Sequence, residues 1–191
     1  MRIIAGEFRS RRLKSVPGTA TRPTSDKLRE TLFNVLGARV AGSSWYDCFA
    51  GSGAVGLEAL SRGAAFVVFV ENAGAAVRVL RENVSALGVE DRCEVADQPA
   101  VAALARARRA AGFVFLDPPY TADVEYRRIL TFFGESRLLR PGGLVIAEHA
   151  RRSPLGESYG RLLRTRVLEQ GDSALSFFGV PAPGGSAPPE P

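Results

Sequence analysis

The sequence is poor in the residues that bind metals or form disulfides. Its 191 residues include one histidine and two cysteines, and the cysteines do not form a C-x-x-C motif. Structural zinc sites usually take four Cys or His ligands. His149, Cys48 and Cys93 are too few and too widely spaced for such a site. We therefore expect no bound metal.

Long apolar runs are also missing. No run approaches the roughly 18 residues that a membrane-spanning helix needs. The initial segment MRIIAGEFRSRR lacks the apolar centre of a signal peptide. These two absences predict a cytoplasmic protein. The apolar content of 46%, over a length typical of one domain, predicts a folded chain with a sizeable core.

Positive charge is present, but it is concentrated at one end of the chain. The net charge is +5, and residues 1–39 hold nine Arg or Lys against three carboxylates. A basic segment on a nearly neutral body is typical of a protein that binds a polyanion. A solvated, solubilising surface is the alternative, which charge by itself leaves open. The predicted phosphate-binding residues are Arg9, Arg11, Arg12, Lys14 and Arg22.

Residues 1–40 are predicted to form an arm followed by a helix. The loose alternation in MRIIAGEFRSRRL, together with Gly6, suits a short hairpin or an extended arm. In TRPTSDKLRETLFNVLG the apolar residues recur at helical spacing. Thr24 or Ser25 can cap the start of this helix, and Gly37 is placed to end it.

From residue 45 onward, strand and helix patterns alternate. Strand patterns in WYDCF, FVVFVE, RCEVAD, FVFLDPPY and LVIAEH are separated by helical patterns, among them residues 99–110 and 123–133. This order predicts an α/β fold with a doubly wound, mostly parallel sheet that is covered on both faces. RLLRTRVLEQ and ALSFFGV, joined by the turn GDS, predict a C-terminal antiparallel hairpin. The domain would span residues 41–180, and residues 181–191 would be a disordered tail.

A glycine-rich loop follows the first strand. YDCFAGSGAVG places Gly51, Gly53 and Gly56 between a strand and a helix, and Glu71 ends the next strand. This is the spacing of the dinucleotide fingerprint, so a nicotinamide-dependent oxidoreductase is one interpretation. Glycine lets the backbone approach a ligand closely, as any nucleoside cofactor bound here would require. The glycines therefore predict a cofactor site without choosing the cofactor.

Acidic residues around the loop favour a cofactor without phosphate. Asp47, at the expected mouth of the loop, would repel a pyrophosphate and attract a cation. S-adenosylmethionine carries an ammonium and a sulfonium group. Its amino-acid end would suit Asp47, its ribose Glu71, and its adenine Asp97. These acids would end consecutive strands, at the edge where open α/β sheets bind ligands. Phe49 and Asn72 complete the predicted set.

The stretch FLDPPY ends the fourth predicted strand abruptly. Pro118 and Pro119 cannot donate to a β-ladder, so the strand must stop there. The corner offers the Asp117 carboxylate, the Pro118 carbonyl and the ring of Tyr120. Such a corner can accept the hydrogens of a planar amine and stack on its ring, so these four residues are the predicted catalytic site for amine methylation. A strand-ending turn with a packed aromatic ring is the structural alternative.

The motifs together resemble a known family. DCFAGSGAVGLEALSRGA, VFVEN and FVFLDPPY resemble the class I methyltransferase fold, which is Rossmann-like, in its amino-methylating branch. RIIAGEFRSRRLKSV and TRPTSDKLRETLFNVL are similar to the N-terminus of the RsmD family, and the similarity covers residues 1 to about 180. It implies S-adenosylmethionine as the cofactor and a guanine-N2 amine of bacterial 16S ribosomal RNA as the substrate. The sequence leaves open whether that RNA is presented naked, in a ribosomal-protein complex or assembly intermediate, or within the small subunit.

Two further activities suit parts of the same pattern. A DNA adenine amino-methyltransferase would use the same corner chemistry, and only the N-terminal resemblance favours RNA. A non-catalytic RNA-binding or assembly factor would not need Asp117 and Tyr120. Cys48 is expected to pack rather than to act as a nucleophile, and His149 to be structural or peripheral. Glu148 is given no role.

Overall fold

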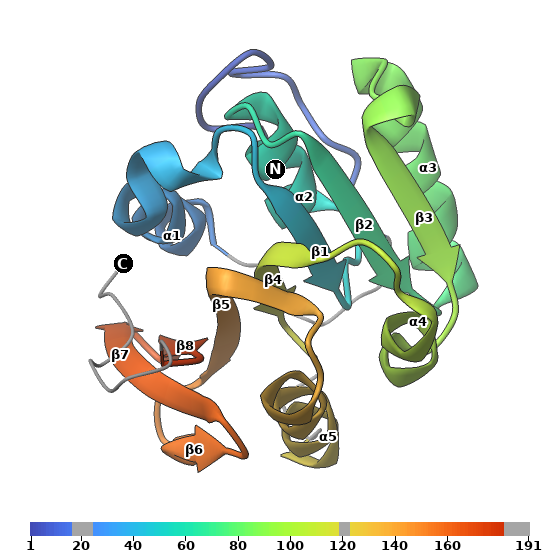
Figure 1. Cartoon of the computed structure of the whole chain (residues 1–191). Helices are drawn as coiled ribbons and strands as arrows, with labels where there is room; N and C mark the ends of the chain where they lie inside the picture. The colour runs from blue at the N-terminus through green and yellow to red at the C-terminus, as the bar shows by residue number, and fades with distance from the viewer. Residues whose placement is uncertain (17–24, 119–122, 182–191) are drawn as a thin grey trace.

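A computed structural model describes residues 1–16, 25–118 and 123–181. Its centre is an eight-stranded sheet with the strand order β3-β2-β1-β4-β5-β8-β7-β6 (Figure 1). The five strands from β3 to β5 pair in parallel, and the remaining pairs are antiparallel. The strands are β1 (Ser44–Cys48), β2 (Phe66–Glu71), β3 (Cys93–Asp97), β4 (Ala111–Leu116), β5 (Leu139–Ala150), β6 (Ser158–Tyr159), β7 (Leu162–Gln170) and β8 (Ser173–Gly179). This arrangement confirms the predicted sheet and C-terminal hairpin.

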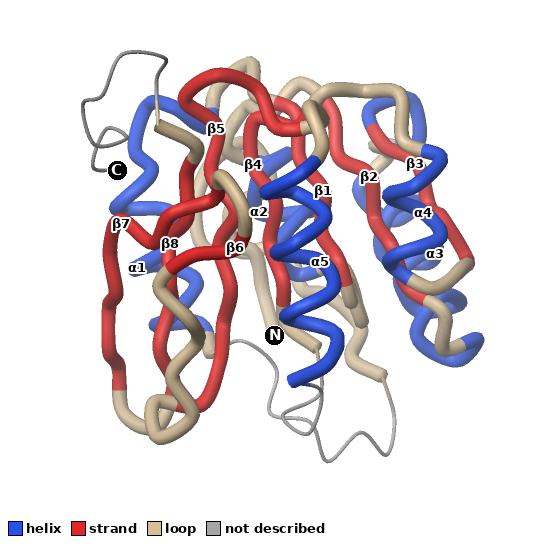
Figure 2. Tube along the Cα trace, turned by 60° about the horizontal axis from the view of Figure 1, so that its bottom comes forward, coloured by secondary structure: helices blue, strands red, loops and turns tan. Residues whose placement is uncertain are grey.

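Helices cover both faces of the parallel part. One apolar cluster joins the sheet to the first three α-helices, and a second joins the opposite face to the last two. In Figure 2, α4 and α5 lie on the viewer's side of the sheet, with α1 and α2 behind it. The helices are α1 (Asp26–Leu36), α2 (Ala54–Ser61), α3 (Gly74–Leu87), α4 (Ala100–Arg106) and α5 (Asp123–Glu135), with short 3-10 turns η1 (Gly37–Val40) and η2 (Glu90–Arg92).

Helix α1 has the predicted caps. The Ser25 hydroxyl accepts a hydrogen bond of 3.1 Å from the Leu28 N–H, which satisfies one of the amides left unpaired in a first helical turn. Gly37 follows the last turn at a φ of 52°, a left-handed value that favours glycine. The apolar side chains at helical spacing are buried against the sheet, so the predicted amphipathic helix is confirmed.

Helix α4 is shorter than predicted. It ends at Arg106, although the Ala- and Arg-rich sequence continues to residue 110. Strand β4 already begins at Ala111, so residues 107–110 are needed to bring the chain back across the sheet. Helix propensity is overridden here by the position of the next strand. The short helix leaves part of the sheet face beneath it less covered.

The N-terminal residues form the predicted hairpin. Arg2 and Arg12 form an antiparallel bridge, and Ile3 and Leu13 are buried in the same apolar cluster as α1 to α3. At the turn, Gly6 has a φ of 84°, and a Cβ there would lie 1.8 Å from the Ser61 carbonyl oxygen. Because Ser61 ends α2, the turn lies at the amino ends of the strands, at the top of Figure 1. The predicted arm is thus a docked part of the fold.

Within the described ranges, no helix has the length and apolar character needed to cross a membrane. The predicted tail 181–191 lies outside these ranges, apart from Pro181.

Candidate functional site

Three of the predicted acids meet at the carboxyl edge of the sheet. Glu71 and Asp97 are register partners on β2 and β3. Cys48 pairs with Val70 on one side and with Leu116 on the other, so the chain positions that follow, including Asp117, reach the same edge. Ligands of open α/β folds bind along this edge. The strands therefore bring the predicted cofactor and catalytic segments together.

Asp47 does not lie where the sequence analysis placed it. It sits inside β1, pairs in register with Phe69, and is only 2% exposed. Its Oδ2 accepts a hydrogen bond of 2.9 Å from the Gly56 N–H in the first turn of α2. The strand runs one residue past Asp47, and side-chain alternation then points its carboxylate toward α2. The prediction that Asp47 lies at the mouth of the loop is wrong, because its buried carboxyl binds the Gly56 N–H on the core side of the loop.

The buried Asp47 carboxyl should make stability depend on pH. Burial, aided by the charge of Glu71, raises its pKa from 3.8 to about 7, although the Gly56 N–H acts in the opposite direction. Between these values the folded state keeps a proton that the unfolded chain releases. The free energy of unfolding should therefore fall as pH rises from about 4 to 7, by at most about 1.4 kcal/mol per unit.

Urea unfolding of the wild type and Asp47→Asn from pH 5 to 8 measures this dependence. The asparagine keeps an acceptor for Gly56 but cannot ionise. The variant should gain stability relative to the wild type as the pH increases. Parallel curves would show that Asp47 does not titrate in this window.

Glu71 binds the glycine loop to the end of β2. Its Oε2 accepts from the Gly51 N–H at 2.8 Å. Its Oε1 accepts from the N–H groups of Asn72 at 2.9 Å and Ala73 at 2.8 Å. The carboxylate is half-buried, so it is fixed in orientation yet reaches the edge of the sheet. Asn72 itself is exposed beside it.

Glycine is required at the three loop positions for different structural reasons. A Cβ at Gly53, which has a φ of 84°, would lie 2.4 Å from Leu80 Cδ1, and one at Gly56 would lie 2.3 Å from Phe69 Cε1. These two glycines let α2 pack closely against β2 and α3. A Cβ at Gly51 would meet nothing within 4 Å, although its φ is 56°. Only Gly51 therefore borders open space that a ligand can use.

This difference gives a matched pair of variants. Gly56→Ala forces a Cβ against Phe69 in the core and should lower the free energy of unfolding by about 1–3 kcal/mol. Gly51→Ala meets no atom and has only its left-handed φ to accommodate, about 1 kcal/mol. In thermal unfolding, Gly56→Ala should therefore have a lower melting temperature than Gly51→Ala. The reverse order would show that packing against β2 does not determine the glycine at position 56.

Phe49 lies in the loop and has an unusual backbone conformation. Its φ is 64°, a left-handed value that is uncommon for a residue other than glycine, aspartate or asparagine. Such a conformation costs free energy and persists only where the surroundings hold it, and it is frequent at ligand-binding sites. The Ala50 N–H donates to the Val70 carbonyl at 3.1 Å, which fixes the chain just after Phe49.

The predicted catalytic corner is described only in part. Asp117 follows β4 and is half-buried, and Pro118 is buried. Pro119 and Tyr120 lie outside the described residues, as does Arg22 of the predicted phosphate-binding set. Next to the corner, the buried Tyr126 of α5 donates its hydroxyl to the Glu148 carbonyl of β5. This contact ties the helix after the corner to the neighbouring strand.

The remaining candidates near the edge are packed. Burial, followed by the charge of Asp47, raises the pKa of the Cys48 thiol, which disfavours a thiolate nucleophile. Both His149 ring nitrogens have partners, the Ser176 hydroxyl at 2.8 Å and the Ala150 carbonyl at 3.0 Å. Desolvation lowers the pKa of His149. These observations agree with packing and structural roles. The Glu148 side chain is buried as well.

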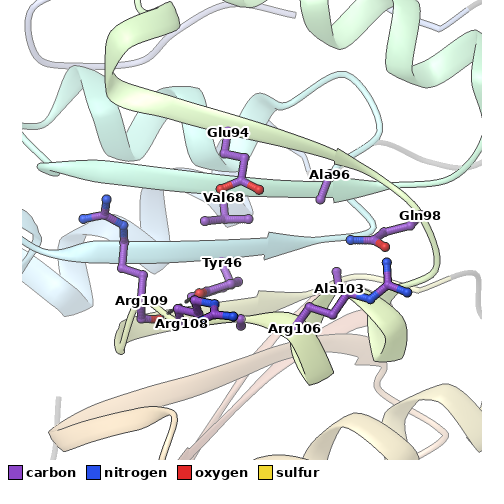
Figure 3. A pocket seen from close by; sticks show the side chains of 10 residues that line it. Tyr46, Val68, Glu94, Ala96, Gln98, Ala103, Arg106, Arg108 and Arg109 are labelled. Atoms are coloured by element: carbon purple, nitrogen blue, oxygen red, sulfur yellow. Dashed lines mark hydrogen bonds between the residues drawn. The ribbon is translucent and has the colours of Figure 1, made fainter.

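A separate cavity of about 330 Å³ lies beneath α4 (Figure 3). It occupies the face opposite to Asp47, and Ala96 and Gln98, on either side of Asp97 in the sequence, bring it close to the carboxyl edge. None of Glu71, Asp97 and Asp117 lines it. The candidate site is therefore the edge of the sheet and not this cavity. Tyr46, Val68, Glu94, Ala96, Gln98, Ala103, Arg106, Ala107, Arg108 and Arg109 form its walls.

The basic residues of the N-terminal hairpin are not equivalent. Arg9 and Arg12 are exposed, and neither makes an ion pair within the described ranges. Arg11 donates to the Ala86 carbonyl at 2.6 Å, in the last turn of α3 where carbonyls lack helical partners. Lys14 pairs with Glu82 at 2.8 Å, but both side chains are exposed. Of the predicted phosphate-binding residues that the structure describes, Arg9 and Arg12 are thus the ones whose side chains are not engaged by α3.

The backbone of the hairpin is held by buried charged groups that the sequence analysis missed. Glu58 of α2 is fully buried and accepts from the N–H groups of Ile4 at 2.7 Å and Ala5 at 3.0 Å. Arg29 of α1, also fully buried, donates to the Arg2 carbonyl at 2.6 Å. Arg62 neutralises Glu58 at 2.7 Å. For Glu58, a charged residue inside the otherwise apolar helix α2 was the available signal. Arg29 gave no such signal, because α1 holds several other charged residues.

No group of three or more His, Cys, Asp or Glu side chains within residues 1–16, 25–118 and 123–181 is arranged to hold a metal ion. The polar groups of the candidate site are instead carboxylates and backbone amides. This set suits a ligand with hydroxyl and amine groups.

The chain is similar to a described protein family and to several curated proteins. The family model described as Conserved hypothetical protein 95 matches residues 1–179. YlbH of Bacillus subtilis, described as a proposed rRNA methyltransferase, is 39% identical over 181 residues, covering 93% of this chain and 98% of YlbH. Ribosomal RNA small subunit methyltransferase D of Haemophilus influenzae is 36% identical over 158 residues, covering 81% of each chain.

Solved structures show the same fold. The structure of yhhF from Escherichia coli, described as a proposed methyltransferase, matches with a TM-score of 0.83 at 31% identity, over 93% of this chain and 96% of that chain. An RNA methyltransferase from Salinibacter ruber, solved in complex with S-adenosyl-L-homocysteine, matches with a TM-score of 0.62 at 21% identity, over 88% and 100%. The predicted class I methyltransferase fold is confirmed.

Proposed function

The chain belongs to the family described as Conserved hypothetical protein 95, the RsmD family, and from this premise we propose a specific reaction for it. The protein transfers a methyl group from S-adenosylmethionine to the exocyclic N2 amine of a guanine in 16S ribosomal RNA. The observation that carries the proposal is the shared edge of the sheet, where Glu71 and the glycine loop adjoin Asp117 and Pro118. The names of the relatives support the rRNA substrate.

The residues present fit this cofactor. The open space at Gly51 admits a ligand against the loop backbone. Glu71 and Asp97, at the same level of the sheet, can accept hydrogen bonds from ribose hydroxyls and from the adenine amine. Because a dinucleotide site also places an acid at the end of this strand, the choice of S-adenosylmethionine over a nicotinamide cofactor is supported by the methyltransferase relatives. When bound, S-adenosylmethionine supplies an electrophilic methyl group.

We assign the other cofactor residues a supporting part. Asp47 acts through the loop, because its carboxyl is bonded to Gly56 and buried behind the glycines. Phe49, half-buried against the second apolar cluster, and Asn72, exposed after the end of β2, are assigned to the borders of the cofactor space. Gly53 and Gly56 keep α2 close to the sheet, so that the loop stays at the edge.

Asp117 and the Pro118 carbonyl hold the amine of the target base. The lone pair of a guanine amine is delocalised into the ring, so the nitrogen is a poor nucleophile. Two acceptors for its hydrogens favour a pyramidal nitrogen with a directed lone pair. The carboxylate also stabilises the positive charge that develops on nitrogen during transfer. In this proposal Tyr120 stacks on the base and Pro119 keeps the corner rigid.

The cofactor assignment is tested separately from the substrate. Calorimetry with S-adenosylmethionine should give a binding isotherm with one site per chain. A fluorescence titration with NADH should show no saturable binding. Saturable NADH binding without S-adenosylmethionine binding would favour the oxidoreductase interpretation of the glycine loop.

The basic segment 1–40 is proposed to dock the RNA, and the domain 41–180 to carry the reaction. If Arg9 and Arg12 contact phosphates, Arg9→Ala with Arg12→Ala should flatten the dependence of log K on log salt by about one to two units. Binding of 16S rRNA, measured between 50 and 300 mM salt, about the range over which such contacts weaken, gives this slope. Arg11 is left intact because it holds the end of α3.

The matched control removes the same charge elsewhere. Arg137→Ala with Arg140→Ala changes two exposed arginines near the start of β5. This control should keep the wild-type slope. An unchanged slope in the Arg9 and Arg12 variant would favour a solvated surface over a docking element.

A further inference from the structure

A single buried amide side chain joins the glycine loop to the N-terminal hairpin. Asn83 lies on α3, is 2% exposed, and faces the core between apolar neighbours on the same helix. Its Nδ2 donates to the Ser52 carbonyl at 2.9 Å, between Gly51 and Gly53 of the loop. The same Nδ2 donates to the Lys14 carbonyl at 3.0 Å, and its Oδ1 accepts from the Lys14 N–H at 2.8 Å.

The chemistry of the partners fixes the orientation of this amide. Two carbonyls require donors, and one N–H requires an acceptor, so only one of the two amide orientations satisfies all three. No other side chain of similar size supplies this combination. An aspartate would place an oxygen against both carbonyls, and a leucine would leave three backbone groups, one buried and two partly buried, without this partner.

The two segments that Asn83 joins have separate parts in the proposed reaction. Ser52 belongs to the loop whose Gly51 borders the cofactor space. Lys14 is the last charged residue of the hairpin and leads through Ser15 and Val16 toward α1. Glu58 and Arg29 hold the first strand of the hairpin, and Ser61 holds its turn. The Arg11 and Lys14 side chains contact α3 but do not reach the loop. Asn83 is thus the direct connection between the loop and the second strand.

We propose that Asn83 is a positioning residue that couples occupation of the cofactor loop to ordering of the RNA-docking hairpin. A ligand that fixes the Ser52 carbonyl also fixes the amide, which then holds the Lys14 N–H and carbonyl. Coupling of this kind is reciprocal, so RNA bound to the hairpin strengthens cofactor binding by the same factor. The inference rests on the proposed function for the identity of the two ligands.

Hydrogen exchange of the hairpin amides, with and without S-adenosyl-L-homocysteine, tests the coupling. In the wild type, the ligand should slow exchange of the Lys14 amide even though it binds at the glycine loop. In Asn83→Ala this ligand-dependent protection should disappear, and calorimetry should show about tenfold weaker ligand binding. Asn83→Ser, which introduces no charge and keeps a small polar group too short to reach both segments, is the second variant if Asn83→Ala does not fold. Asn34→Ala, at an exposed position of α1, is the control and should behave as the wild type.

The outcomes separate this proposal from the proposed function. Ligand binding to the wild type without protection of Lys14, or equal protection in Asn83→Ala, would overturn the coupling. A lower thermal stability of the variant, with ligand-dependent protection retained, would also overturn it, since that is the behaviour of a structural residue. Failure of the wild type to bind S-adenosyl-L-homocysteine at all would instead contradict the cofactor assignment.

Discussion

Asp117→Asn is expected to lower kcat by about 100- to 1,000-fold while leaving the affinity for S-adenosylmethionine unchanged. The asparagine retains one acceptor oxygen but presents an amide donor to the target amine, and it removes the negative charge that favours the developing cation. Because this interaction is made in the transition state, the loss should appear in kcat. Single-turnover kinetics with saturating cofactor, together with calorimetry, measure both quantities.

Asp123→Asn provides the control for this variant. Asp123 begins α5 a few residues later and is exposed, so the same change of charge is made near the corner without altering it. This variant should keep wild-type kcat. An equal loss of cofactor affinity and turnover in Asp117→Asn would contradict the assignment of Asp117 to the amine.

Glu71→Ala should have the opposite effect, weakening cofactor binding and changing kcat little. It removes the acceptor of the Gly51 N–H and the charged acceptor proposed for the ribose hydroxyls. Cofactor binding should weaken by about 1–3 kcal/mol, which is about 5- to 150-fold in Kd. The rate at saturating cofactor should change far less, because Glu71 does not touch the amine in this account.

Glu94→Ala is the matched control. Glu94 lies on the neighbouring strand β3 but faces the cavity beneath α4. Its removal should leave cofactor affinity unchanged. Wild-type affinity in Glu71→Ala would remove Glu71 from the site, and weakened affinity in Glu94→Ala would place part of the cofactor in that cavity.

Local patterns predicted the elements and most of the edge of the sheet. Alternating strand and helix periods identified the parallel sheet, and Ser25 and Gly37 marked the ends of α1. Glu71 and Asp97 lie side by side at the carboxyl edge because each is the last residue of its strand. The sequence alone can identify such strand ends. Asp47 differs because its strand continues to Cys48, and the direction of its side chain follows from that single extra residue.

The contacts that anchor the hairpin could not be predicted in the same way. They join backbone groups of residues 2–14 to side chains more than 20 positions away. Because nearly all residues carry the same backbone groups, the sequence does not indicate which of these groups are bonded. Arg29 and Asn83 were visible only as polar residues within amphipathic helices, and Glu58 only as one charge within the apolar helix α2. The position of the hairpin turn, at the amino ends of the strands, likewise depends on where α2 ends. A charge count therefore identified the basic segment but not which of its arginines hold the fold.

Transfer of a labelled methyl group to defined nucleic acids tests the central claim most directly. The protein and labelled S-adenosylmethionine are incubated separately with unmethylated small ribosomal subunits, naked 16S rRNA and adenine-rich duplex DNA, and the products are digested to nucleosides for mass spectrometry. The account predicts N2-methylguanosine at one position of 16S rRNA, from the subunits or the naked RNA, and its loss with Asp117→Asn. Label in N6-methyladenine of DNA, or in any RNA nucleoside other than N2-methylguanosine, would contradict it.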